Sequence, residues 1–267
     1  GVDNTASGFK ALYANTTGER NLAIGYQTLD AADTEDDNLA IGYDALGGAI
    51  AGGEYNVAIG NYSMDALTSG DYNTAVGYNS LTAITTGENN TAAGYNALSS
   101  NAGSDNTAIG FEAVQVTSGS NNTGVGFRAI NNVESADNNT ALGHRAGDVI
   151  TTGANNIIIG QGSDPSGAAG ANQIVIGTGA TGHGDNIAVI GNGSNTAIHP
   201  HDDNEVDLGS SSYEYKDLYV DGVAYLDAVG FGSTSITLPT ADGSADQVIK
   251  TDGSGALGWT SISSTPS

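Results

Sequence analysis

The stretch Asn73-Thr-Ala-Val-Gly-Tyr-Asn-Ser-Leu81 decides the fold, because variants of the same phrase return about every 17 residues. The glycine of the phrase marks each copy, at Gly8, Gly25, Gly42, Gly60, Gly77, Gly94, Gly110, Gly126, Gly143, Gly160, Gly177 and Gly191. A period this short and regular predicts a solenoid of stacked coils rather than a globular core. Eleven steps between these glycines, at the roughly 4.8 Å spacing of paired strands, predict a coil stack on the order of 50 Å long.

The charge of the chain narrows the classes of partner. Six basic residues against 30 acidic ones give a formal net charge of −24. Nucleic acid and anionic membrane surfaces both require Lys and Arg, so neither is an expected partner. The sequence has no run of about 18 apolar residues, which predicts no insertion into a membrane. It also contains no cysteine, so disulfide and thiol chemistry are excluded.

The phrase opens with an asparagine, and stacked coils bring successive asparagines close enough for their side-chain amides to form a ladder. The expected ladder residues are Asn21, Asn38, Asn56, Asn73, Asn90, Asn106, Asn122, Asn139 and Asn156.

Two apolar columns follow the asparagine, on opposite faces of the expected strand. The branched residues are predicted to point into the coil; they are Ile24, Ile41, Ile59, Val76, Ile109, Val125, Leu142 and Ile159. The small residues between are predicted to point outward; they are Ala23, Ala40, Ala58, Ala75, Ala92, Ala108 and Ala141. An outward face of Ala, Asn and Gly without charge suggests close approach of another chain, so this alanine column is the predicted trimer interface.

After the glycine comes an aromatic residue, and three positions later a leucine or a similar residue, as in Tyr78-Asn-Ser-Leu81. This spacing favours a helical turn over a flat strand, although a strand with a corner stays open. The aromatic side chains are expected either in the core or at a surface that contacts glycans by stacking. The tyrosines considered for that contact are Tyr26, Tyr43, Tyr62, Tyr78 and Tyr95.

An acidic column precedes the asparagines, and its members are Glu19, Asp36, Glu54, Asp71, Glu88 and Asp137, with Asp105 displaced by one place. We interpret it as a solvated edge that deters aggregation, with weak Ca²⁺ or Mg²⁺ binding as the alternative. A transition metal is a further alternative at His199 and His201, if three chains bring these imidazoles to a three-fold axis. His144 falls in the aromatic column, where it replaces a tyrosine. No other cofactor is expected.

The repeat divides the chain into four predicted parts. Residues 1–160 form the main solenoid, and residues 161–197 form narrower terminal coils in which the aromatic half of the phrase is lost. Residues 198–232 form a junction or shaft segment, and residues 233–267 form a C-terminal β segment. The short strands of the last two parts are too small to bury a core alone, which predicts that they intertwine with partner chains.

The phrase Asn186-Ile-Ala-Val-Ile-Gly191 resembles the head repeats of trimeric autotransporter adhesins, and the longer phrase around Gly77 resembles repeats of phage tail fibres. The segments Asp207–Gly222 and Gln247–Thr260 are similar to segments of structural proteins of tailed phages, cyanophages among them. The adhesin resemblance implies an all-β, left-handed parallel β-roll with three chains packed side by side. The membrane anchor of an autotransporter is not found in this sequence, which favours the phage branch.

The expected function is therefore a structural and adhesive fibre segment of a phage tail, located on the virion outside the cell. Its expected partners are two further copies of the chain, other tail proteins, and a glycan or protein receptor on the host surface. The alternative is a bacterial surface adhesin head. A polysaccharide-depolymerising tailspike is a weaker alternative, because the carboxylates follow a repeating edge and not a cleft, so no enzymatic activity is expected.

Overall fold

The computed structural model describes residues 1–101, 103–195, 198, 208, 210, 212–221, 228–231, 234–237, 239, 244–251, 253 and 257–262. The chain divides into two units, residues 1–198 and residues 199–267. All regular elements of the described residues are β-strands, and none of these residues belongs to a helix long and apolar enough to cross a bilayer. The all-β class predicted by the repeat is confirmed for the part of the chain that the structure describes.

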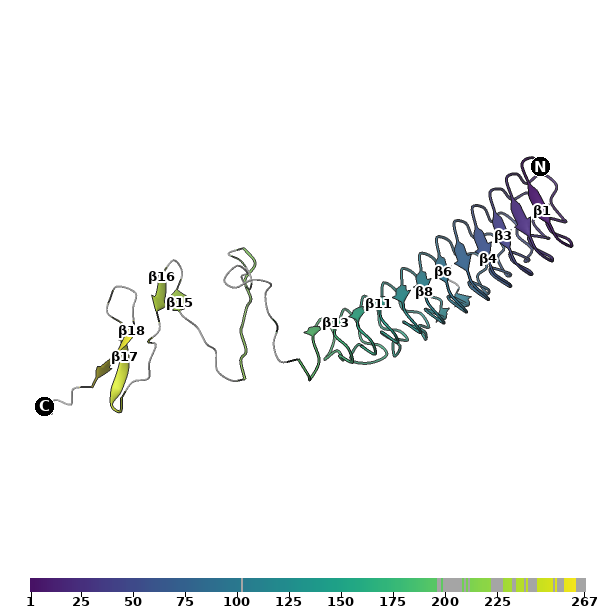
Figure 1. The fold of residues 1–267 in the computed structure, drawn as a ribbon. Helices are drawn as coiled ribbons and strands as arrows, with labels where there is room; N and C mark the ends of the chain where they lie inside the picture. Colours follow the sequence, from purple (N-terminus) through teal and green to yellow (C-terminus); the bar gives the residue numbers. More distant parts are fainter. Residues whose placement is uncertain are drawn as a thin grey trace. The chain divides into compact units, whose positions relative to one another are not determined.

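The first unit is a parallel β-solenoid, seen in Figure 1 as a regular stack of coils from the purple N-terminal end to the green end at β13. One 12-stranded sheet runs along it in the order β1-β2-β3-β4-β5-β6-β8-β10-β11-β12-β13-β14. Its strands are β1 (Thr5–Ser7), β2 (Leu22–Ile24), β3 (Leu39–Ile41), β4 (Val57–Ile59), β5 (Thr74–Val76), β6 (Thr91–Ala93), β8 (Thr107–Ile109), β10 (Thr123–Val125), β11 (Thr140–Leu142), β12 (Ile157–Ile159), β13 (Ile174–Ile176) and β14 (Ala188–Ile190).

The strands of this sheet pair so that equivalent positions of successive repeats lie side by side. Ala23 pairs with Ala40 and Ile24 with Ile41, and every later rung continues the same alignment. A separate pair, β7 (Ser100–Asn101) and β9 (Val116–Thr117), adds a short parallel ladder in the middle of the stack. The sheet continues without a break through β14.

The interior of the coil is filled by the small residue of each strand and by a large residue from the turn that follows it. The alanine column is fully buried within a single chain. Opposite it lie Leu29, Leu46, Met64, Leu81, Leu98, Val114 and Ile130, which are also fully buried. A second layer that includes Ile50, Leu67 and Ile84 completes this core. The methyl group of the alanine, the large turn residue and the second layer therefore fill the coil together.

The facing predicted for the strands is wrong. Ala23, Ala40, Ala58, Ala75, Ala92, Ala108 and Ala141 point inward and have 0% exposure, so they cannot form an interface with another chain. The branched column points outward instead, as Ile24 at 40% and Ile109 at 45% exposure show. Strand alternation fixes only that neighbouring side chains face opposite ways. The space inside the coil decides which side chain points inward. Gly124 stands in the alanine column, and even a Cβ added there would lie 2.5 Å from Cγ2 of Val114.

The helical turn predicted after the glycine is also wrong. In the rung of Tyr78, Asn79 has φ 53° and Leu81 has φ 51°, and the equivalent residues of other rungs have the same sign. These left-handed values turn the chain sharply without an α-helix. This turn places the leucine over the inner face of the strand. A helix would instead have carried the leucine along the coil axis.

The second unit contains two antiparallel pairs, β15 (Ala228–Phe231) with β16 (Thr234–Thr237), and β17 (Gln247–Thr251) with β18 (Leu257–Ser261). The boundary predicted between residues 232 and 233 falls between β15 and β16. These two strands pair with each other, so the boundary divides one antiparallel pair instead of two separate segments. The intertwining predicted for this region stays a prediction.

Candidate binding surfaces of the solenoid

The outward side of the 12-stranded sheet is an uncharged and largely apolar surface of the first unit, and we call it the strand face. It consists of the first and third residues of each strand, such as Leu39 and Ile41 in β3 or Thr107 and Ile109 in β8. No strand from β1 to β14 in this sheet contributes a charged side chain to it. Exposed branched residues recur along it at Ile24, Ile59, Val76, Ile109, Leu142, Ile174, Ile176 and Ile190. The strand face replaces the alanine column as the candidate interface.

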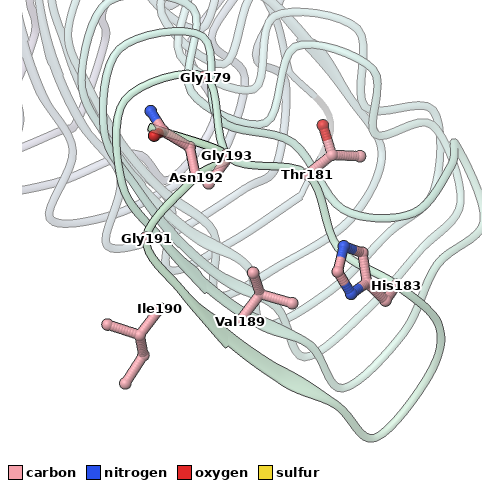
Figure 2. Close-up of a pocket in the computed structure, with 9 residues that line it drawn as sticks. Gly179, Thr181, His183, Val189, Ile190, Gly191, Asn192 and Gly193 are labelled. Atoms are coloured by element: carbon pink, nitrogen blue, oxygen red, sulfur yellow. The ribbon is translucent and has the colours of Figure 1, made fainter. Parts of the chain in front are cut away.

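Figure 2 shows the same alternation at the last rung, where Val189 points into the coil and Ile190 points away from it. These two residues line a cavity of about 530 Å³ together with Thr181, His183 and Asn192. The cavity lies at β14, the last strand that the structure describes in this sheet. It is the open end of the coil interior, left where the described stack of strands ends.

A stack of rings runs beside the strand face, and we call it the ring ladder. It is continuous from Phe9 to His144 through Tyr26, Tyr43, Tyr62, Tyr78, Tyr95, Phe111 and Phe127. Neighbouring ring centroids lie 4.9 to 5.8 Å apart. His144 stacks on Phe127 at 4.9 Å, which confirms that it occupies the aromatic column. Each pair stabilises contact between successive coils by about 0.5–1.5 kcal/mol.

The ring ladder changes the prediction that its tyrosines contact glycans by stacking. In most of the column the ring planes are nearly parallel, for example 4° apart between Tyr26 and Tyr43. The rings with parallel neighbours on both sides therefore have both faces covered; they are Tyr26, Tyr95, Phe111 and Phe127. Tyr62 interrupts the pattern, since it meets Tyr43 and Tyr78 at 61° and 81°. A sugar could meet the four covered rings at their edges, but not by stacking on their faces.

The asparagine ladder is present and joins successive coils from Asn4 to Gln173. The side-chain Oδ1 of each asparagine accepts the backbone N–H of the asparagine one coil later, at 2.8 to 3.1 Å from Asn4 through Asn156. Its Nδ2 donates to a corner carbonyl, as Asn56 does to Gly70 at 2.9 Å. Direct amide-to-amide bonds also occur, for example Asn90 to Asn73 at 3.1 Å. Gln173 stands at the next position, where its backbone N–H donates to Oδ1 of Asn156 at 3.0 Å.

The acidic column has a structural use that the sequence did not reveal. The Oδ1 of Asp36 accepts the N–H of Glu19 at 2.7 Å, and the Oδ1 of Asp71 accepts the N–H of Glu54 at 2.8 Å. Asp137 binds the N–H of Ser120 in the same way. These carboxylates thus close the corner between successive coils. Among the described residues, no group of three His, Cys, Asp or Glu side chains is arranged to hold a metal ion. His199 and His201 lie outside the described residues.

A second aromatic contact lies at the opposite end of the strands from the ring ladder. Tyr55 and Tyr72 precede the ladder asparagines of successive coils, and their rings stack at 5.1 Å with 4° between the planes. Both side chains are about half exposed, at 46% and 57%. Next to them in the same column, Arg20 binds Asp37 through Nε and Nη2, each at 2.7 Å. The 17-residue spacing of the two tyrosines was the sequence signal for this pair.

Neither a family model nor a curated protein sequence matches this chain.

Proposed function

We propose that this chain is a structural and adhesive segment of a phage tail fibre, in which the solenoid serves as a rod outside the cell. The observation that carries the proposal is the unbroken parallel register of the 12-stranded sheet. Backbone bonds tie each rung to the next, and the asparagine ladder from Asn4 to Gln173 and the ring ladder from Phe9 to His144 add to them. Such a stack resists bending and stretching along its axis, which is what a projecting fibre requires.

The proposal includes assembly of three copies through the strand face. The strand face is about 50 Å long and, for three residues of strand, about 10 Å wide, so its area is on the order of 500 Å² before the ring ladder is added. A monomer rarely leaves a contiguous apolar patch much larger than this exposed, and a stable interface buries roughly 800 Å² on each partner. The strand face and the ring ladder together approach that size. The number of copies follows from the resemblance to trimeric β-rolls.

The charge distribution supports the same assembly. The strand face is uncharged, while the carboxylates of the acidic column, such as Asp36, Asp71 and Asp137, lie at corners of the coil. Three chains that meet through strand faces would therefore keep their carboxylates apart and in water. The remaining net charge of −24 per chain would discourage further lateral association of the finished fibre.

Immunogold electron microscopy with an antibody against the purified chain tests the location. The proposal predicts gold on the tail projections of virions. Label on the bacterial envelope alone would contradict it and favour the alternative, a surface adhesin head. A purified chain that releases new reducing ends from host capsule would instead indicate the third candidate, a depolymerase.

A further inference from the structure

Tyr55 and Tyr72 depart from the chemistry of the column in which they stand. The residue before each ladder position has a positive φ in every rung, and nine of the twelve residues there are Asp or Asn: Asp3, Asp37, Asn89, Asp105, Asn121, Asn138, Asn155, Asn172 and Asn186. Asn and Asp tolerate this left-handed backbone, whereas a bulky side chain at φ 57° is uncommon and costs about 1–2 kcal/mol. The two tyrosines therefore occupy positions that the fold fills more favourably with asparagine.

The contacts of the two tyrosines within the chain do not offset this cost. Their rings are half exposed, so they add little to the core. The one ring contact between them contributes about 0.5–1.5 kcal/mol, against two unfavourable backbone positions. Local strain without an internal gain is typical of a functional position. Half-exposed tyrosines are also the residues that most often supply contact area to a partner at low entropic cost.

The charged groups beside the pair restrict the chemistry of that partner. Glu54 and Asp71 directly precede the two tyrosines, and Asp37 lies one coil away. The guanidinium of Arg20 is engaged by Asp37 and so offers little charge to a ligand. The hydroxyl of Tyr55 is protonated at neutral pH and able to donate, and the charge of Asp37, followed by burial, raises its pKa further above the ordinary value of 10. The patch thus combines hydroxyl donors, carboxylate acceptors and aromatic surface, and it repels anions.

We propose that Tyr55 and Tyr72 form a contact site for an uncharged glycan. A sugar chain supplies hydroxyl groups that accept from tyrosine and donate to Glu54 and Asp71, and its C–H groups pack on the ring edges and on the outer ring surfaces. Acidic polysaccharides are excluded by the carboxylates. The site rests on the proposed adhesive function, because it names the class of receptor that the fibre would recognise.

The test compares the full chain with the double variant Tyr55→Asn, Tyr72→Asn on an array of neutral and acidic bacterial polysaccharides. Asparagine is the residue that this column uses elsewhere, so the variant is expected to keep the fold and the same β-sheet circular dichroism. We expect the unchanged chain to bind a neutral polysaccharide and the double variant to bind it at least about tenfold more weakly. The matched control Tyr13→Asn alters a tyrosine that is 74% exposed and outside the pair, and its binding is expected to stay unchanged.

Three outcomes would overturn the inference: no neutral polysaccharide binds, the double variant binds as well as the unchanged chain, or only a cationic probe such as polylysine binds. The failure of the proposed function has a different signature. If the antibody does not label virions while the Tyr-dependent glycan binding persists, the fibre assignment is wrong and the site stands. If virion tails are labelled and the double variant binds normally, the site is wrong and the fibre assignment stands.

Discussion

Replacing Asn106 by alanine removes one rung of the asparagine ladder at a place where its bonds are complete. Asn106 is fully buried. Its Oδ1 accepts the N–H of Asn122 at 2.9 Å, and its Nδ2 donates to the carbonyl of Gly119 at 3.0 Å. Alanine leaves that amide and that carbonyl without these partners inside the coil. At about 1–3 kcal/mol for each buried backbone group, the local stability should fall by about 2–6 kcal/mol.

Hydrogen exchange followed by mass spectrometry measures this loss where it occurs, which matters because a long repeat array need not unfold in one step. A loss of 2 kcal/mol corresponds to exchange about 30-fold faster in peptides that contain residues 119–125. The matched control is Asn121→Ala, next to the ladder residue Asn122 but exposed, with φ 60°. It should cost only the roughly 1–2 kcal/mol of an alanine in the left-handed region. Equal protection in the Asn106→Ala variant and the unchanged chain would refute the ladder as a source of stability.

Three further predictions concern the core and the corners of the coil. Gly124→Ala should destabilise its rung by about 1 kcal/mol, because overpacking against Val114 costs about 1–3 kcal/mol and exceeds the gain from replacing glycine. The double variant Gly124→Ala, Val114→Ala should recover this loss of stability. A single variant that is more stable than the unchanged chain would contradict this packing. Glu35→Gln should lower the free energy of unfolding by about 2 kcal/mol, because the buried carboxylate accepts four hydrogen bonds and an amide nitrogen turned toward those donors cannot accept them. Chemical denaturation measures this loss, and an unchanged free energy of unfolding would contradict the role given to the carboxylate. Burial and the charge of Asp148 raise the pKa of Asp164, so the folded chain gains stability as the pH falls toward the ordinary pKa of 3.8. Asp164→Asn should therefore raise the melting temperature at pH 7, and this gain should shrink near pH 4. A gain in melting temperature that does not depend on pH would refute this cause.

The period of the sequence predicted the architecture because every rung repeats the same bonding requirement. Asn73 and its equivalents recur at one position, and only stacked coils bring such residues into a ladder. The aromatic column was equally visible, but its role was not. For Tyr95 the sequence left open whether the ring lies in the core or at a glycan-contacting surface. In the structure, rings stack on both of its faces, and the side chain is about half exposed.

The facing of the strand could not be predicted because alternation has two solutions. Size favoured Ile109 inside and Ala108 outside, and the structure has the reverse. The deciding fact is the left-handed backbone after the glycine, which swings a residue such as Val114 over the inner face of the strand. Once this residue fills the coil, the strand has room for a methyl group only. The alanine column therefore lies inside the coil, and the uncharged surface that we propose for assembly is the strand face on the other side of the same strands.

Light scattering on the full chain in solution, with the Ile109→Asp variant measured beside it, reports whether copies of the chain assemble through the strand face. We predict a mass of about three times 26.6 kDa for the unchanged chain. We also predict dissociation of the variant into folded single chains, because the new carboxylate stands on the strand face and not in the core. A mass of 26.6 kDa for the unchanged chain, or a variant that keeps the assembled mass, would contradict assembly through the strand face.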